Sequence, residues 1–123
     1  MPILYAEFKG QQQFVTQAPI PGLSLTIPEG AGEQALIILN VPASYNVGGS
    51  GDGSGGQFNL SVDGTMLPEY AAYNYGQYGS YGLPLRMPAT LVVAVPLTLK
   101  QQTVVAYAQT CIIDTSASLS VLI

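Results

Sequence analysis

Five of the eight tyrosines of this chain lie within twelve residues, in the stretch YAAYNYGQYGSY from Tyr70 to Tyr81. A tyrosine ring offers a flat apolar face and a hydroxyl, and the Gly, Asn, Gln and Ser residues between the rings add hydrogen-bonding groups without charge. This composition is typical of contact loops, although a loop whose rings only cover the edge of a core would have the same composition. The stretch therefore favours binding over catalysis.

Groups for acid–base catalysis are few. The chain contains no histidine, so it lacks the commonest general base and the commonest metal ligand. Its carboxylates are Glu7, Glu29, Glu33, Asp52, Asp63, Glu69 and Asp114. Their spacing pairs no two of them, as a glycosidase would need, although strands distant in sequence could still bring two together. We therefore expect that the protein is not an enzyme and uses no catalytic residue, metal or cofactor.

The composition indicates a single domain over residues 1–123, long enough to bury a core. Hydrophobic residues make up 48% of the chain and charged residues only 8%, with a formal net charge of −4. Because a soluble monomer usually carries more charge, we expect copies of the same chain to cover much of the surface. The basic side chains are Lys9, Arg86 and Lys100, too few for binding to nucleic acid or to an anionic membrane.

Membrane insertion is not expected, because the chain has no run of about 18 uncharged apolar residues. The N-terminal segment MPILYAEFKG lacks the pattern of a secretory signal. We therefore expect synthesis in the cytoplasm, with any release or display at the cell surface by a non-standard route. Cys111 lies in the apolar run TCII and has no second cysteine to pair with, so we expect a small buried side chain.

The elements that must position any binding residues are predicted to be strands. Gly22–Ile27, Gln57–Asp63 and Ser116–Ile123 alternate apolar and polar residues with period 2, which predicts strands with one buried face. Ala35–Val41 and Thr90–Val95 are apolar on both faces. This pattern predicts strands covered by a second sheet on one side and by a neighbouring subunit on the other.

Two further strands are predicted at Ile3–Phe8 and Thr103–Thr110, and Asp63-Gly64 predicts a hairpin turn. The segment Gly48–Gly56 contains the pattern GxGxxG, but no helical period follows it, so it predicts a flexible loop and not a phosphate site. Many short strands separated by glycine and proline indicate an all-β protein with a β-sandwich or jelly-roll fold.

Three motifs occur in the order ILNVPASY (Ile38–Tyr45), RMPATLV (Arg86–Val92) and DTSASLS (Asp114–Ser120). Together with the opening MPIL, they resemble the N-terminal domain of the Burkholderia superlectin family, and the resemblance covers nearly the whole chain. It implies a tumour-necrosis-factor-like (TNF-like) jelly roll that binds fucosylated glycans as a compact homotrimer. Each sugar site would lie between two neighbouring protomers, and the ligands would be cell-surface glycans or small sugars.

The resemblance also implies sugar-binding residues. Tyr45 stands where the family has a tyrosine near the sugar, and Arg86 matches the family's sugar-binding arginine. Asp114 matches a family aspartate that could orient Arg86 or accept a sugar hydroxyl, and Thr115 keeps the hydroxyl of a family serine. Arg86 is the only arginine of the chain, and its planar fork suits two adjacent hydroxyls. The alternative role for Arg86 is an ion pair between subunits, with Asp114 or Glu69.

Other family contacts fall on changed positions. Tyr107 and Gln57 stand where the family has a second arginine and a tyrosine. A Thr-Tyr contact of the family falls in the tyrosine-rich stretch, where Tyr73, Asn74 and Tyr75 are the candidates. We expect this stretch to lean over the Arg86 of a neighbouring protomer and to determine which sugar is bound.

Two functions from different classes follow. The first is a trimeric lectin that binds fucosylated or related glycans between protomers, favoured by Tyr45, Arg86 and Asp114. The second is a non-enzymatic structural or assembly jelly-roll module, whose tyrosine-rich loop contacts another protein. The changes at Gln57, Leu83, Pro84 and Tyr107 weigh against the lectin.

Overall fold

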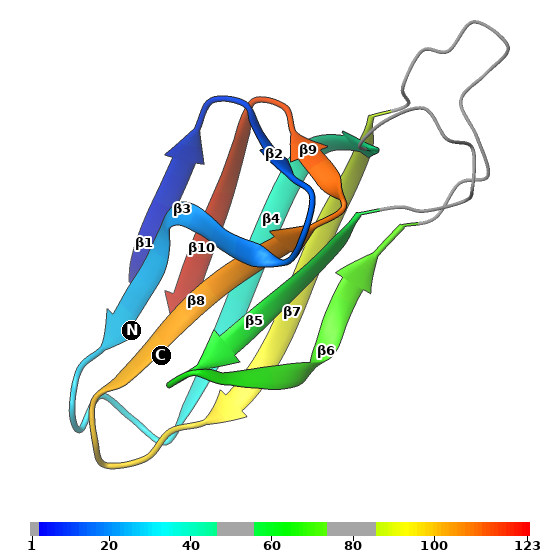
Figure 1. The fold of residues 1–123 in the computed structure, drawn as a ribbon. Helices are drawn as coiled ribbons and strands as arrows, with labels where there is room; N and C mark the ends of the chain where they lie inside the picture. The colour runs from blue at the N-terminus through cyan, green and yellow to red at the C-terminus, as the bar shows by residue number, and fades with distance from the viewer. Residues whose placement is uncertain (1–2, 47–55, 74–85) are drawn as a thin grey trace, which may run out of the picture.

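The computed structural model describes residues 3–46, 56–73 and 86–123, and the regular structure in these ranges consists of β-strands (Figure 1). No helix that could cross a membrane occurs in the described ranges. The described strands are β1 (Ile3–Lys9), β2 (Gln12–Phe14), β3 (Ala18–Ile27), β4 (Gln34–Asn46), β5 (Gln57–Val62), β6 (Thr65–Ala72), β7 (Met87–Pro96), β8 (Gln102–Gln109), β9 (Cys111–Ile113) and β10 (Ser116–Leu122).

Two antiparallel sheets lie face to face, and Figure 1 shows one in front of the other. Sheet A has the order β1-β10-β4-β9-β2, with β7 also paired to β4, and sheet B has the order β3-β8-β5-β6. β9 lies beside the last residues of β4, where β10 no longer pairs with β4, and β2 pairs with β9 as β1 pairs with β10. Both short strands are therefore at the end of the sandwich where β4 ends and β7 begins. We call this the upper end, as it lies in Figure 1. The architecture confirms the predicted all-β sandwich.

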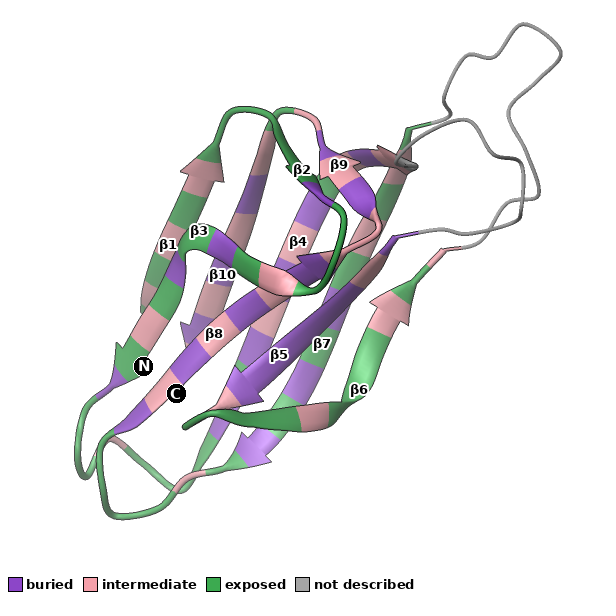
Figure 2. Ribbon diagram, viewed as in Figure 1, coloured by how far each residue is buried: buried purple, intermediate pink, exposed green. Residues whose placement is uncertain are grey.

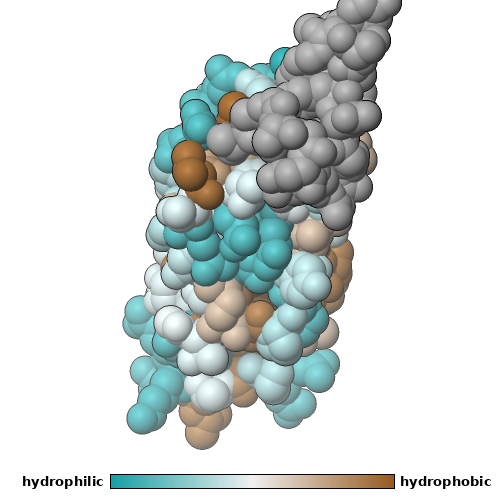
Figure 3. Space-filling view, turned by 45° about the vertical axis from the view of Figure 1, so that its right-hand side comes forward, coloured by the Kyte–Doolittle hydropathy of each residue, from teal (hydrophilic) through white to brown (hydrophobic). Residues whose placement is uncertain are grey.

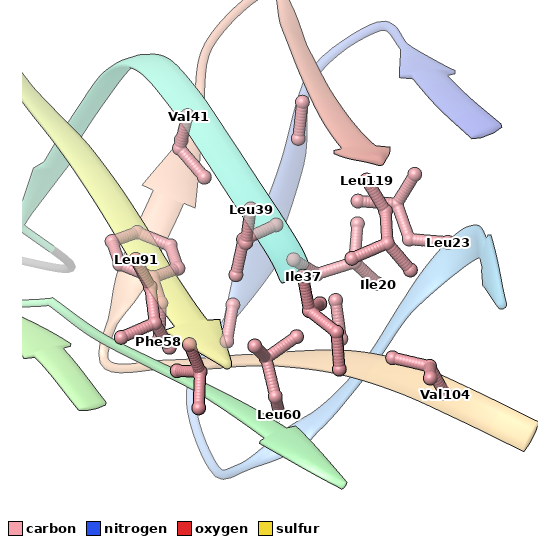
Figure 4. Close-up of a cluster of buried hydrophobic side chains, with 14 of the residues drawn as sticks. Ile20, Leu23, Ile37, Leu39, Val41, Phe58, Leu60, Leu91, Val104 and Leu119 are labelled. Atoms are coloured by element: carbon pink, nitrogen blue, oxygen red, sulfur yellow. The ribbon is translucent and has the colours of Figure 1, made fainter. Parts of the chain in front are cut away.

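The core lies between the two sheets (Figure 4). Ile37, Leu39 and Val41 of β4 are at most 1% exposed, and they pack in one cluster with Phe58 and Leu60 from sheet B. Figure 2 shows the same alternation of buried and partly exposed residues along β8. Full burial of one such side chain stabilises the fold by about 1.5–3 kcal/mol. The period-2 pattern therefore predicted the inward faces correctly.

β4 and β7 carry apolar residues on their outward sides as well. Leu36 is 37% exposed and Val92 is 53% exposed, both on the face of sheet A that points away from sheet B. We call this face the outer face of sheet A. The prediction for Ala35–Val41 and Thr90–Val95 is confirmed on the side that sheet B covers. Cover by a neighbouring subunit on the other side stays a prediction.

A bulge in β4 changes which side chains point outward at the upper end. Between Val41 and Ser44, β4 advances by three residues (41 to 44) while β7 advances by two (89 to 87). The extra residue lies at positions 42–43 and reverses the alternation, as bulges do. Even-numbered residues point outward before the bulge, whereas after it Ser44 is buried and Tyr45 points outward.

The predicted hairpin turn is confirmed. Asp63 and Gly64 connect β5 to β6 with φ values of 52° and 82°, the positive values that a tight two-residue turn requires. β6 is an edge strand of sheet B, where Pro68 can be accommodated because an edge needs fewer ladder hydrogen bonds. The expectation of a loop from Tyr70 onward is wrong for residues 70–72, which pair with β5 in this edge strand.

Some sequence predictions lie outside the described residues. These are the glycine-rich segment apart from Gly56, and the part of the tyrosine-rich stretch that follows Tyr73. Asn74 and Tyr75, two of the candidate sugar contacts, fall in this second segment.

Candidate functional site

One row of side chains crosses the upper end of the outer face of sheet A. Gln13 of β2 pairs with Ile112 of β9, and Ile112 pairs with Tyr45 of β4. Extending the antiparallel pairing of β4 and β7 by one residue places Arg86 beside Tyr45. Paired residues point to the same face of a sheet, so these four side chains lie in sequence across it. We call them the upper row.

Arg86 is held from two directions. Its Nε donates a hydrogen bond to Oδ2 of Asp114 within an ion pair. Its guanidinium carbon lies 5.0 Å from the centre of the Tyr45 ring, within the range of a cation–π contact. The hydrogen bond to Asp114 and the charge of that carboxylate raise the pKa of the Arg86 guanidinium above its ordinary value. Arg86 is therefore a permanent cation with a defined orientation, on a side chain that is 54% exposed.

Asp114 lies where it can orient Arg86, one of the two roles expected from the sequence. It follows β9, and its backbone N–H donates to the carbonyl oxygen of Ala43, in the β4 bulge, at 3.0 Å. The ion pair with Asp114 forms within one chain. An ion pair of Arg86 between subunits stays a prediction. Because Asp114 engages Nε, the two terminal nitrogens of the guanidinium form a planar fork that could donate to two adjacent hydroxyls.

Tyr45 is fixed at its hydroxyl as well as at its ring. Nε2 of Gln11 donates a hydrogen bond to the Tyr45 hydroxyl at 2.7 Å. A pocket of about 240 Å³ opens beside this contact, and its lining consists of Gln11, Gln12, Gln13, Tyr45 and Ile112. Sequence reasoning missed the three glutamines. They are placed beside Tyr45 by the pairing of β2 with β9. Both strands are too short to show a period in the sequence, so no signal there predicts this pairing.

Thr115 is exposed at the same end of the molecule, directly after Asp114. Its carbonyl oxygen accepts a hydrogen bond from the backbone N–H of Gly10 at 2.8 Å, which closes the turns between β1 and β2 and between β9 and β10. Tyr45, Arg86, Asp114 and Thr115 thus gather at one end of sheet A, and we call them the first group.

Tyr107 and Gln57 belong to the other sheet, and we call them the second group. Tyr107 of β8 pairs with Asn59 of β5, and Asn59 pairs with Tyr70 of β6. Nε2 of Gln57 donates to Oδ1 of Asn59 at 3.2 Å. Buried residues alternate with these along β8, so the second group points away from the core on the outer face of sheet B. Figure 3 shows hydrophilic side chains at the centre of the surface on this side of the molecule.

Tyr73 differs from the other candidates because its ring is packed. The ring centre lies 6.4 Å from that of Phe58, and the Tyr73 hydroxyl accepts a hydrogen bond from the buried Ser44 Oγ at 3.0 Å. A Cβ atom on Gly56 would lie only 2.7 Å from the Tyr73 hydroxyl oxygen, so the ring also fills the space that glycine leaves. This arrangement gives Tyr73 a structural role directly beneath Tyr45, which follows Ser44 in β4.

The remaining predictions on chemistry concern cysteine and metals. Cys111 is fully buried, as expected, and burial raises the pKa of its thiol from 9.0 to about 12. In the described ranges, no group of three or more Cys, Asp or Glu side chains is arranged to hold a metal ion.

Comparisons with known proteins bear on the family and the fold. A family model described as the Bc2l-C N-terminal domain matches residues 9–122. Among solved structures, the globular domain of a zebrafish complement 1qA protein aligns with a TM-score of 0.67 at 8% identity, covering 100% of this chain and 97% of that one. Eiger TNF from S. frugiperda aligns with a TM-score of 0.53 at 12% identity, covering 100% and 94%. No curated protein matches the sequence.

The two structural similarities are low in identity and therefore show the fold alone, which is a TNF-like jelly roll, as predicted. The family match extends over most of the sequence, from the last residue of β1 to the end of β10, and confirms the resemblance seen in the three motifs. The chain belongs to the Bc2l-C N-terminal domain family.

Proposed function

We propose that the protein is a trimeric lectin that binds fucosylated or related glycans at sites between neighbouring protomers. The observation that carries this proposal is the arrangement of Arg86, Tyr45 and Asp114. An exposed guanidinium is oriented by a carboxylate and lies against an aromatic ring. Sugars present adjacent hydroxyls and apolar C–H faces, which match the fork of Arg86 and the ring of Tyr45.

The number of carboxylates at the site favours binding of a sugar over its hydrolysis. Among the described residues, Asp114 is the only carboxylate in contact with Arg86, and that contact occupies one of its oxygens. Glycoside hydrolysis uses two carboxyl groups on either side of the bond that breaks. The first group supplies one carboxylate, which acts as an orienting partner.

Support for a trimer comes from the lower half of the outer face of sheet A. Two cross-strand rows run there, Ile3–Leu122–Leu36–Ala94 and Tyr5–Ser120–Ile38–Val92. Ile3 is 63% exposed and Val92 is 53% exposed in the single chain. Apart from Ser120, the members of these rows are apolar or aromatic and are exposed or partly exposed. Such a surface on a chain with so little charge supports association. We call these two rows the apolar rows, and we propose that they pack against neighbouring protomers.

Support for a site between protomers comes from the separation of the two groups of candidate residues. The first group lies on the outer face of sheet A and the second on the outer face of sheet B. Stacked sheets are about 10 Å apart and these faces point in opposite directions, so one protomer cannot bring both groups to one sugar. In a cyclic trimer, the second group of one protomer can face the first group of the next.

A trimer would also make weak sites effective. Single sugar sites usually bind weakly, and three linked sites raise the local concentration of one ligand at the next site. The proposed ligand is therefore a clustered glycan on a surface, in preference to a free monosaccharide.

A glycan array with the purified protein and its Arg86→Ala variant tests the proposal. We expect binding to fucosylated or related glycans and loss of that binding in the variant, because the fork and its charge are removed. Lys100→Ala removes an exposed cation far from the site and should bind as the wild type does. Absence of binding to all glycans, in a protein whose mass is that of a trimer, would favour the assembly module instead.

A further inference from the structure

The pocket beside Tyr45 has no role in the contacts described so far. Its lining contains three consecutive glutamines, and all three side chains are exposed. Resting on the lectin function proposed above, we infer that this pocket is a second sugar subsite. It would bind the residue linked to the sugar held by Arg86, so that the protein selects a neutral oligosaccharide over a single sugar.

The position of the pocket follows from the register of the sheet. Gln13, Ile112 and Tyr45 are paired in sequence across β2, β9 and β4, and Arg86 follows Tyr45. Neighbouring strands are about 4.8 Å apart, so the distance from Arg86 to Gln13 across the sheet is about 14 Å. This length exceeds one pyranose ring. A ligand that lies along the upper row must extend from the Arg86 fork into the pocket.

The lining has the chemistry of a sugar subsite. Each glutamine amide has one acceptor oxygen and two donor hydrogens, so it can pair with hydroxyls in either role. Gln12 and Gln13 form no side-chain hydrogen bond with another described residue, so their amides are available. Ile112 lies between Gln13 and Tyr45 and provides an apolar surface for a C–H face. A pocket of about 240 Å³ with apolar and polar groups of this kind suits one small ring.

Charge at the upper end favours a neutral ligand. Among the described residues, the charge of Arg86 is compensated by Asp114, and Lys9 is paired with Glu7 at 3.3 Å. The pocket itself is lined by uncharged side chains. A sialylated or sulfated sugar would therefore find no free cation in the pocket, and its desolvation would not be compensated.

Tyr45 connects the two subsites. Its ring faces the Arg86 guanidinium, and its hydroxyl is held by Gln11 at the edge of the pocket. Gln11 therefore has two functions, positioning of Tyr45 and lining of the pocket. Gln13 lines the pocket but forms no hydrogen bond with Tyr45, so it has the lining function without the positioning one. Substitution of Gln13 is for this reason the specific test.

The experiment first uses an array to measure binding of L-fucose, D-galactose and D-mannose, and of neutral di- and trisaccharides that end in each of these sugars. The sugar that binds most tightly and the oligosaccharide that ends in it are then compared by calorimetry. We expect the oligosaccharide to bind about tenfold more tightly than its terminal sugar, the effect of one or two additional hydrogen bonds. Gln13→Ala should remove this difference and leave the affinity for the single sugar within about twofold. A sialylated counterpart should bind no more tightly than the neutral oligosaccharide.

Controls separate this inference from the lectin proposal. Gln101→Ala, an exposed glutamine in the turn before β8, should change neither affinity. Gln11→Ala should weaken both ligands, because it also releases Tyr45. Equal affinities of the wild type for single sugar and oligosaccharide, or an unchanged oligosaccharide affinity in Gln13→Ala, would refute the subsite while the lectin function stands. Loss of all sugar binding in the wild type itself would refute both.

Discussion

The two ends of the outer face of sheet A differ in chemistry although the same strands run through both. At the lower end, Ile3 of β1, Leu36 of β4 and Val92 of β7 present aliphatic side chains to solvent. At the upper end, the same β4 presents Tyr45, and the residue before β7 is Arg86. One end has the character of an interface between protomers, and the other that of a site for polar ligands.

A single backbone feature separates the two ends. The bulge at residues 42–43 of β4 reverses the alternation, so that the outward position passes from even to odd residues. Without it, Ser44 would point outward and Tyr45 into the core. In the proposed lectin, β4 thus serves both association and ligand binding, because its register changes between the two ends.

The largest expected effect comes from placing a charge in the apolar rows. Val92→Glu should convert the proposed trimer to monomers, because an interface that buries an unpaired carboxylate loses several kcal/mol. Light scattering should show the mass of one chain. Glycan binding should be lost with it, since the proposed site needs two protomers.

The matched control is Thr26→Glu, at an exposed position on the outer face of sheet B. It should leave the mass unchanged. If Val92→Glu keeps the mass of the wild type, the apolar rows are not the interface, and the distinction between the two ends fails.

The second effect concerns the support beneath the upper row. Gly56→Ala should lower the free energy of unfolding by about 1–3 kcal/mol, because its Cβ would overlap the Tyr73 ring that is held by Ser44 and Phe58. Urea unfolding measures this change. Tyr73→Phe removes only the hydroxyl and should cost less, about 1 kcal/mol. An effect of Gly56→Ala below that of Tyr73→Phe would show that the ring moves away freely.

The effect that is smallest at neutral pH concerns Cys111, which precedes Ile112 of the upper row in β9. At pH 8 the thiol should react with a disulfide reagent only after unfolding, because burial raises its pKa from 9.0 to about 12. The folded state keeps the proton that the unfolded state loses. The contribution of this group to stability is therefore full below pH 9 and is lost as the pH rises toward 12.

The slope of the free energy of unfolding from this group should be about −1.4 kcal/mol per pH unit within that window. Cys111→Ala should remove this part of the slope while other groups still titrate. Rapid reaction of the native thiol at pH 8 would contradict the burial of β9.

The strands that form the centre of both sheets could be predicted from the sequence. Ser116–Ile123 shows a clear period of 2, Ala35–Val41 and Thr103–Thr110 are runs rich in strand-forming apolar residues, and each of the three corresponds to a strand. β2 and β9 were missed because three residues cannot show a period. β6 was missed because it is an edge strand with Pro68 and with largely exposed residues on both faces, so no alternation marks it.

The site was predictable in part. The positions of Tyr45, Arg86 and Asp114 came from motifs shared with a family, and the structure places them in contact. The position of the glutamines beside Tyr45 could not be predicted, because it depends on the pairing of β2 with β9. These strands lie about a hundred positions apart in the chain. The resemblance makes Tyr73 a candidate for a family sugar contact, and composition does not show that its ring is packed against Phe58.

The central claim is that each sugar site combines Arg86 of one protomer with Tyr107 of its neighbour, and subunit mixing tests it directly. Arg86→Ala and Tyr107→Ala should each fail to bind glycan as pure trimers. When the two variants are unfolded together and refolded as mixed trimers, about a quarter of the sites should contain both native residues, because each site joins two different protomers. Measurable glycan binding restored by mixing is the expected result. Mixed trimers that bind no glycan, when wild-type protein refolded in the same way does, would contradict the account.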